Sequence, residues 1–382
     1  MIRTKEREPK LIAILCDTPY QLVSGIFMAN HISRDEKLLI FLNTLWGKSA
    51  RKFDVNGAGE RIHKVLYYGQ EQMGLGMLLK GLRNPLDMLR RMDGFDPEFD
   101  ITAIITTRTT WMATYLYDYY KTKNNGLKMY LIEEGCSEYT SHMGETRFTR
   151  ACKLLFKKTH YDFIDAAYFS APELYPYKLP FPLHKLPCSA DDTDSVRLID
   201  SLFQTSGDLD KLAPYSCIFL DEGFNRPELT DRFGDFEENI LTRITRVMDK
   251  KDVVIKMHPR TNGYDTQTGV QAVYTKFPFE ILPAHVNLNN RVVVSALSTA
   301  MLTSKFLYDQ EPYLVFTYHL VMDVLRVIVP DKKMLEASIR LMEGVRTIYR
   351  DKDKVFAPKT LDELEAAFVQ INAKIAVSAQ KT

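Results

Sequence analysis

The sequence lacks the features that mark several specialised classes of protein. It has no excess charge of one sign, because 50 Lys and Arg residues stand against 49 Asp and Glu residues, so the whole molecule has no electrostatic preference for nucleic acid. It has no apolar run long enough to cross a bilayer, and the run at residues 11–16 is too short for the core of a signal peptide. It has no internal repeat and no low-complexity segment. We therefore expect an ordinary globular protein in the cytoplasm.

Cysteine and histidine are few and follow no ligand spacing. The five cysteines form no CxxC pair, which argues against a disulfide framework and a structural zinc site and favours a reducing compartment. The eight histidines form no HExxH motif. Asp-x-Asp sequences occur at residues 192–194, 208–210 and 351–353, where we expect solvated acids. The sequence therefore predicts no metal and no cofactor.

The 382 residues, 45% of them hydrophobic, suit two α/β domains. Short apolar runs alternate with helical segments, which is typical of parallel, doubly wound, Rossmann-like sheets. We expect strands at residues 11–16, 37–42, 62–67, 101–106, 128–132, 166–170, 217–220, 251–257, 279–282, 291–295, 313–316 and 345–349.

A proline-rich, polar stretch interrupts this alternation between residues 179 and 214. The prediction is therefore a first domain at 1–185, a linker at 186–213 and a second domain at 214–358. The last segment, 359–382, is expected to be a helix that packs back on the first domain.

The strongest chemical signal lies in the second half of the chain. The strand at 251–257 is followed at once by His258-Pro259-Arg260. Proline cannot donate to a sheet ladder, so the strand should end here. An imidazole and a guanidinium would then lie at a strand's carboxyl end, where open α/β sheets bind ligands. An ordinary turn is the simpler interpretation.

A second polar segment follows the strand at 291–295. Ser298 and Thr299 are preferred N-cap residues and precede a segment of helical character. A helix N-terminus with two hydroxyls suits a phosphate group, although such a pair is more often only a cap. The two segments together favour a nucleotide-sugar phosphate site.

Two acid pairs follow predicted strands, Glu133-Glu134-Gly135 and Asp221-Glu222-Gly223. A carboxylate at a strand's carboxyl end can take a proton from an acceptor hydroxyl if its pKa is raised. The alternative for each is a solvated acidic turn. We favour the first pair as the base, because the predicted phosphate ligands occupy the second domain.

A basic helix is expected near residues 147–157. Arg147, Arg150, Lys153 and Lys157 share one face, which suits the anionic inner face of a membrane. A solvated face of an ordinary helix is the alternative.

Four segments in order resemble the bacterial GT-B sialyltransferases. They are Ile14-Leu-Cys-Asp-Thr18-Pro19-Tyr20-Gln21-Leu22, Glu133-Glu134-Gly135, Lys256-Met-His258-Pro259 and Ser295-Ala-Leu-Ser298-Thr299. The likeness is nearest to the lipooligosaccharide sialyltransferases, glycosyltransferase family 52, with the polysialyltransferases as relatives. It implies a GT-B fold, in which two Rossmann-like domains face each other across a cleft.

The resemblance also implies roles for individual residues. Glu134 would be the general base with Glu133 beside it, and His258, Ser298 and Thr299 would hold the departing phosphate. The donor side would further include Pro259, Arg260, Ser295, Glu222 and Gly223. The acceptor side would include Thr18, Pro19, Tyr20 and Gln21. Asp221, Glu222 and Glu237 stay open as alternative bases.

The predicted activity is inverting, metal-independent transfer of sialic acid from CMP-sialic acid to a terminal sugar, often galactose, of a bacterial surface glycan. One alternative is a related GT-B enzyme that uses another CMP- or UDP-activated sugar in capsule or lipopolysaccharide synthesis. A second alternative is a sugar-binding protein without catalytic activity.

Overall fold

The computed structural model describes residues 9–43, 59–69, 84–107, 111–135, 137–140, 160–224, 227–258, 261, 263 and 266–379. The chain forms two compact units. Unit 1 comprises Met1–Glu138 and His142–Gln204, and unit 2 comprises Tyr139–Ser141 and Thr205–Thr382. Each unit has its own sheet and core, and each is described by itself.

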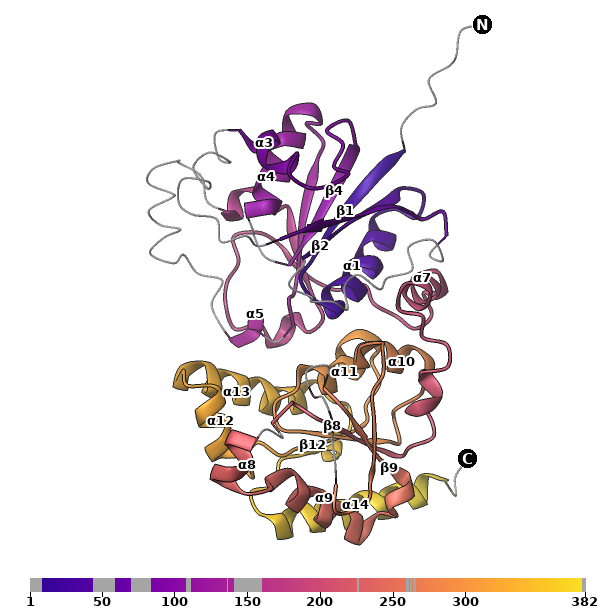
Figure 1. Ribbon diagram of the computed structural model, residues 1–382, viewed down its shortest axis with the longest axis vertical. Helices are drawn as coiled ribbons and strands as arrows, with labels where there is room; N and C mark the ends of the chain where they lie inside the picture. The colour runs from indigo at the N-terminus through magenta and orange to yellow at the C-terminus, as the bar shows by residue number, and fades with distance from the viewer. Residues whose placement is uncertain are drawn as a thin grey trace, which may run out of the picture. The chain divides into compact units, whose positions relative to one another are not determined.

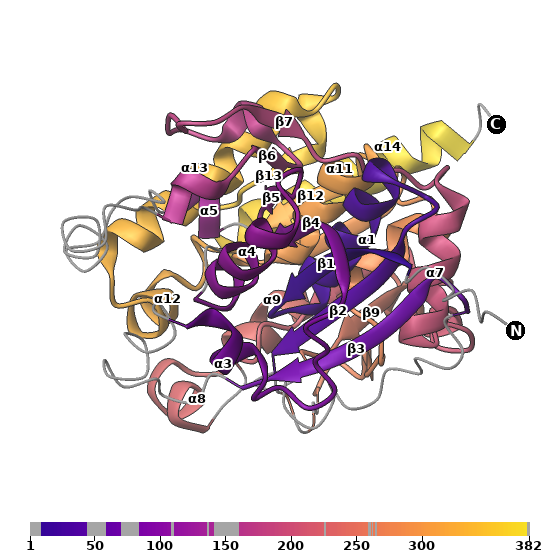
Figure 2. The same ribbon diagram turned by 90° about the horizontal axis from the view of Figure 1, so that it is seen from above.

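Unit 1 is built on a seven-stranded sheet whose neighbouring strands are all parallel. Its order is β3-β2-β1-β4-β5-β6-β7, and Figure 2 shows β1, β2 and β3 side by side. The strands are β1 (Lys10–Cys16), β2 (Lys37–Asn43), β3 (Ile62–Tyr68), β4 (Asp100–Thr106), β5 (Lys128–Ile132), β6 (Ala166–Phe169) and β7 (Leu183–Lys185).

Helices cover both faces of this sheet. Helices α1 (Pro19–Ile32) and α7 (Thr193–Phe203) lie on one face, and α3 (Pro85–Leu89) and α4 (Trp111–Lys123) lie on the other (Figure 1). The α3 and α4 side buries a large apolar cluster that includes Leu15, Phe41 and Leu116. Because both faces are covered, β1 and β2 are almost continuously apolar rather than alternating.

Unit 2 repeats this plan with a six-stranded parallel sheet in the order β10-β9-β8-β11-β12-β13. Strands β8, β9, β11 and β12 are buried at every position, as central strands of a doubly covered sheet should be. The strands are β8 (Cys217–Leu220), β9 (Val253–Lys256), β10 (Gln271–Val273), β11 (Val292–Ser295), β12 (Tyr313–Phe316) and β13 (Val355–Phe356).

Figure 1 shows α9 and α14 on one face of the unit 2 sheet and α10 and α11 on the other. The helices of this unit are α8 (Pro227–Phe233), α9 (Phe236–Val247), α10 (Leu282–His285), α11 (Thr303–Tyr308), α12 (Met322–Ile328), α13 (Lys332–Ile348) and α14 (Leu361–Ala379). Short 3-10 helices precede four elements of this unit: η5 (Lys250–Asp252) before β9, η6 (Phe279–Ile281) before α10, η7 (Thr299–Leu302) before α11 and η8 (Lys352–Lys354) before β13.

In both units the first three strands run outward in one direction and the next strands run outward in the other. This is the doubly wound order of Rossmann-like sheets, and it confirms the predicted fold class. The order reverses between β1 and β4 in unit 1 and between β8 and β11 in unit 2. Ligands of such sheets bind at the carboxyl ends of the strands at this reversal.

Two predicted strands were wrong. Residues 279–282 form the 3-10 helix η6 and the start of α10, where Pro278 and Pro283 cannot donate to a ladder. Residues 345–349 lie mostly in α13, whose buried residues Leu335, Leu341, Met342 and Val345 follow helical spacing. The short strands β7, β10 and β13 were not predicted.

The boundary between the units differs from the predicted linker at 186–213. Helix α7 begins inside that range, and Asp192 caps it by accepting a hydrogen bond from the Ser195 backbone N–H. Helix α7 packs on α1 within unit 1, so the long segment of unit 2 begins after Gln204.

The C-terminal helix also differs from its expected position. Helix α14 packs against α9 within unit 2. Arg243 of α9 contacts Asp362 at 3.0 Å and Glu365 at 2.9 Å. Among the described helices, none combines the length and apolarity needed to cross a membrane.

Candidate functional site

In unit 2 the centre of the candidate site is the acid pair at the end of β8. Asp221 is 4% exposed and accepts three hydrogen bonds. They come from the backbone N–H groups of Gly223 (2.6 Å) and His258 (2.9 Å) and from the hydroxyl of Thr261 (2.6 Å). The carboxylate of Asp221 therefore fixes the loop after β9, which carries His258.

Glu222 reaches the other neighbouring strand. Its Oε1 atom accepts from the Ser295 hydroxyl at 2.5 Å and from the backbone N–H groups of Ala296 and Leu297 at 2.7 and 2.8 Å. Burial raises the pKa of Glu222, and these hydrogen bonds oppose that rise because they favour the charged form. Glu222 therefore fixes the loop after β11, which carries Ser298 and Thr299.

The two acids brace the loops on both sides of β8. Strand β8 lies between β9 and β11, and the sheet order reverses between β8 and β11. The brace therefore lies at the carboxyl-end reversal point where Rossmann-like sheets bind ligands. Asp221 and Glu222 were considered as alternative bases. Both oxygens of Asp221 and the Oε1 atom of Glu222 are engaged in holding loops.

His258 lies at the carboxyl end of β9 and is partly exposed. Gly223 approaches it closely, since a Cβ atom at that position would lie 3.6 Å from the imidazole Nδ1. Gly223 has φ of +69°, which a residue with a side chain adopts only with strain. Pro259 and Arg260, also predicted for the donor side, lie outside the described residues.

Ser298 precedes η7, Thr299 begins it and α11 follows, but the local structure differs from a regular helix cap. Ser298 is the N-cap residue of the 3-10 helix η7, and its side chain makes no capping hydrogen bond. Both residues are partly exposed, and within the described chain neither hydroxyl has a hydrogen-bond partner. Both hydroxyls are therefore available to a ligand. Ser295, in contrast, donates to Glu222 and to the Leu220 carbonyl.

In unit 1 the two glutamates after β5 have opposite surroundings. Glu133 is 1% exposed, and it accepts hydrogen bonds from the hydroxyls of Tyr20 and Ser170 and from the Ser170 backbone N–H. Its carboxylate joins α1, β5 and the end of β6. Glu133 therefore holds the loop in place, and its expected part in catalysis stays a prediction.

Glu134 is partly exposed, and its backbone N–H donates to the carboxylate of Glu138 at 2.8 Å. Gly135 follows with φ of +131°, a conformation that favours glycine. The turn therefore buries Glu133 and leaves the side chain of Glu134 within reach of solvent.

The predicted acceptor residues form the start of α1. Thr18 is the N-cap residue and accepts a hydrogen bond from the Gln21 backbone N–H at 3.4 Å, and Pro19 begins the helix. Tyr20 is 8% exposed and Gln21 is fully buried. Tyr20 donates to Glu133, and Gln21 accepts from the Asp17 backbone N–H at 2.5 Å. Both side chains thus support the site rather than line its surface.

Asp17 was missed by the sequence analysis. It follows β1 at the reversal point of unit 1, and its Oδ1 accepts from Asn43 at 2.8 Å and from the Tyr68 hydroxyl at 2.9 Å. These donors end β2 and β3, so the polar ends of three neighbouring strands meet at one carboxylate. Its place directly after an apolar strand was the signal that could have identified it.

Glu237, another alternative base, is 5% exposed in the first turn of α9. It lines a small internal cavity together with Glu222. Its burial makes it a poor candidate for contact with an acceptor sugar. Among the described residues, no group of three His, Cys, Asp or Glu side chains is placed to hold a metal ion.

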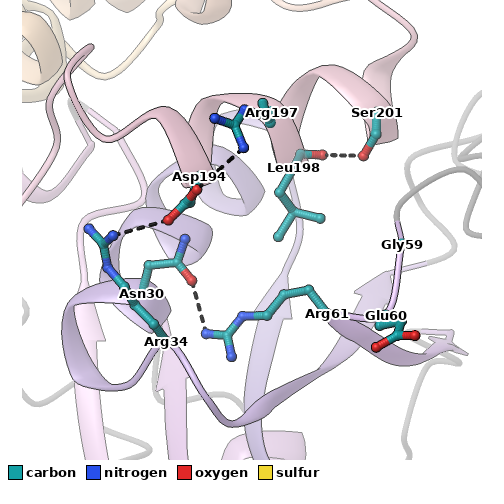
Figure 3. A pocket seen from close by; sticks show the side chains of 9 residues that line it. All are labelled: Asn30, Arg34, Gly59, Glu60, Arg61, Asp194, Arg197, Leu198 and Ser201. Atoms are coloured by element: carbon teal, nitrogen blue, oxygen red, sulfur yellow. Dashed lines mark hydrogen bonds and ion pairs between the residues drawn. The ribbon is translucent and has the colours of Figure 1, made fainter.

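A cavity of about 390 Å³ lies elsewhere in unit 1, between α1, α7 and the start of β3 (Figure 3). Arg34 contacts Asp192 at 3.3 Å and Asp194 at 3.0 Å, and Arg61 donates to Asn30 at 2.9 Å. The cavity is at the amino-terminal ends of β2 and β3, opposite the edge that carries the predicted residues. Arg34 is already matched by two acids of α7 and its cap, so the cavity is not an evident anion site.

The predicted membrane-contact residues Arg147, Arg150, Lys153 and Lys157 lie outside the described residues. Membrane contact therefore stays a prediction.

Comparisons with known proteins reveal likeness in structure only. A scan against protein-family models found no match, and a search of curated proteins found none either. Among solved structures, the chain is similar to UGT2 of Phytolacca americana complexed with UDP-2fluoro-glucose and pterostilbene. That likeness has a TM-score of 0.50 and 11% identity, and it covers 98% of this chain and 94% of that one.

Two bacterial sialyltransferases are also similar. The α/β-galactoside α-2,3-sialyltransferase of Photobacterium phosphoreum has a TM-score of 0.49 and 12% identity, covering 92% of this chain and 99% of that one. The sialyltransferase of Photobacterium damsela has a TM-score of 0.47 and 14% identity, covering 92% and 81%. At such identities a likeness concerns the fold and not the activity. Together with the two strand orders, the comparison with UGT2 identifies the fold as GT-B.

Proposed function

We propose that this protein is an inverting, metal-independent sialyltransferase. It would transfer sialic acid from CMP-sialic acid to a terminal sugar, galactose in the simplest case, of a bacterial surface glycan. The observation that carries the proposal is the brace at the end of β8. Asp221 fixes the loop bearing His258, and Glu222 fixes the loop bearing Ser298 and Thr299.

The brace supports a site for a leaving phosphate. The imidazole of His258 is held on a loop beside one side of β8. The hydroxyls of Ser298 and Thr299, which have no partner in the described chain, are held on a loop beside the other side. Sialyl transfer passes through an oxocarbenium-like centre while negative charge grows on the phosphate that departs. Hydrogen bonds from fixed donors to that growing charge stabilise the transition state more than the ground state.

Glu134 is the proposed general base. It would take the proton of the attacking hydroxyl as the new glycosidic bond forms and the bond to phosphate breaks. This assignment is supported by its exposure next to the fully buried Glu133. Attack from the face opposite the phosphate gives inversion at the anomeric carbon.

Metal independence is part of the proposal for a chemical reason. A nucleoside monophosphate carries less negative charge on departure than a diphosphate does. Hydrogen bonds from His258, Ser298 and Thr299 would therefore suffice to stabilise it, and activity should be insensitive to a chelator.

The test is transfer from CMP-sialic acid to a galactose-terminated acceptor, measured as CMP release and as product by NMR. The wild type is expected to form an inverted product at the same rate with and without EDTA. His258→Ala is expected to lower turnover by about 100- to 10,000-fold while the unfolding midpoint stays unchanged. Turnover by His258→Ala close to that of the wild type would remove the proposed mechanism.

A UDP-activated sugar is the second candidate donor. The structurally similar UGT2 is complexed with UDP-2fluoro-glucose, which is a UDP-sugar analogue. Thermal unfolding with CMP, UDP and GDP distinguishes the candidates, because a ligand that binds only the native state raises the midpoint. Stabilisation by UDP and not by CMP would replace the sialyltransferase proposal with this one.

A further inference from the structure

Lys256, the last residue of β9, is a buried cation with no matched acid. It is 8% exposed. Within the part of the chain that the structure describes, its ammonium group makes no side-chain hydrogen bond and no ion pair within 4.0 Å. Burial of a charge without a partner reduces the free energy of unfolding, and ionisable residues in such surroundings are concentrated at functional sites.

The acids near Lys256 do not neutralise it fully. Glu280 and Asp221 attract it, yet neither carboxylate lies within 4.0 Å of its ammonium group. Burial raises the pKa of Glu280, which weakens it as a counter-charge. Burial also lowers the pKa of Lys256 in spite of both acids, so an additional anion would stabilise its charged form.

Lys256 ends β9 two residues before His258, so it lies next to the candidate phosphate site. Lys256 pairs in register with Leu220, the residue before the acid pair. The ladder continues to Met257, whose N–H donates to the Val273 carbonyl at 2.9 Å. Alternate side chains of an extended chain share a face, so Lys256 and His258 leave β9 on the same side.

We propose that Lys256 binds the phosphate group of the nucleotide donor and supplies the positive charge of that site. The inference rests on the proposed function, since it concerns the same donor. A phosphate that binds beside Asp221 and Glu222 is repelled by their negative charge, and this repulsion must be offset. A lysine ammonium with free donors is suited to offset that repulsion.

The test separates the phosphate from the rest of the nucleotide. Titration calorimetry of the full chain with CMP and with cytidine gives two affinities, and their ratio measures the contribution of the phosphate. Lys256→Met is expected to weaken the binding of CMP by about 10- to 100-fold and to leave the affinity for cytidine within about twofold of the wild type. Lys256→Arg, which keeps the charge, should retain most of the preference for CMP.

Lys251→Met is the matched control, because Lys251 precedes the same strand, is 75% exposed and contacts Asp249 at 3.1 Å. It is expected to bind both compounds as the wild type does. Lys256→Gln, neutral and still polar, provides a second variant with the same expected loss if the methionine variant does not fold.

Two results would overturn the inference, and they differ. If folded Lys256→Met has the same ratio of CMP affinity to cytidine affinity as the wild type, Lys256 does not bind the phosphate, and the proposed function stands. Failure of the wild type to bind CMP overturns the proposed function, and it overturns the role of Lys256 as well if UMP is not bound either. If the wild type binds UMP more tightly than uridine and Lys256→Met loses that preference, the role of Lys256 stands and the donor is a uridine nucleotide.

Discussion

Glu133 and Glu134 are neighbours in sequence with opposite environments, and single substitutions should separate them. Glu134→Gln removes the exposed carboxylate, so it is expected to lower turnover by at least about 100-fold without changing the unfolding midpoint. A CMP-release assay measures the turnover, and differential scanning calorimetry measures the unfolding midpoint.

Glu133→Gln is the matched comparison. The amide would place an N–H₂ group against one of the donors from Tyr20 or Ser170, which now meet a carboxylate. The expected cost is about 1–3 kcal/mol of unfolding free energy, seen as a midpoint lower by several degrees. The assignment of roles would be reversed if Glu134→Gln lost stability and kept its activity.

At the scale of elements, the acid pair after β8 holds the loops after β9 and β11. The hydrogen bonds that Glu222 accepts from Ser295, Ala296 and Leu297 all end on Oε1, and a glutamine oxygen can accept the same three. Glu222→Gln is therefore expected to bind CMP within about threefold of the wild type.

Glu222→Ala removes the acceptor and leaves buried donors unpaired. We expect a loss of about 2–4 kcal/mol in unfolding free energy and weaker CMP binding. Chemical denaturation and calorimetry measure the two effects. Equal CMP binding by the alanine variant and the wild type would show that the loop after β11 holds its shape without Glu222.

A second junction of elements makes stability depend on pH. Burial alone would raise the pKa of Glu311, but hydrogen bonds from the backbone N–H of Arg350, from Lys305 at 2.5 Å and from the Asp351 N–H lower it to about 2. A depressed pKa in the folded state stabilises the protein above the unfolded value near 4.3 and loses that effect as pH falls toward 2.

Glu311→Gln should therefore reduce unfolding free energy at pH 7 by about 2 kcal/mol, less than the full shift because Arg350 is largely exposed. The difference between variant and wild type should shrink as pH falls from 5 to 2. Denaturation curves across this range measure it, and a difference independent of pH would refute the linkage.

At the scale of the whole molecule, the two units should be separable. Unit 2 closes its sheet and core almost entirely from residues 205–382. We expect this fragment to unfold in one cooperative transition and to bind CMP with an affinity near that of the full chain. Circular dichroism and calorimetry test both points. A fragment without a cooperative transition would show that unit 2 depends on unit 1 for its fold.

The doubly wound fold was predictable because buried parallel strands are long apolar runs bounded by turn residues, as in β1 and β2. Strands of two or three residues, such as β13 and β10, carry too little pattern to be distinguished. Residues 345–349 were wrongly predicted as a strand because a short run of this kind fits a strand and one face of a helix equally well.

Within the candidate site, His258, Ser298 and Thr299 were identifiable from their place after strands. The roles of Glu133, Asp221 and Glu222 were not, since only three-dimensional contacts distinguish an acid that braces a loop from one that meets substrate. Lys256 lies in one of the four segments that resemble the sialyltransferases, yet its lack of an ion pair within the described chain depends on distances that no spacing reveals.

The reversal of strand order occurs once in each unit, so each unit has one position of the kind at which Rossmann-like sheets bind ligands. Changes around Asp17 and Glu134 can alter one without touching the groups that hold His258 and Ser298. On the proposed function, a hybrid that joins unit 2 to the first half of a GT-B glycosyltransferase is expected to take its choice of nucleotide from unit 2 and its choice of sugar acceptor from the other parent.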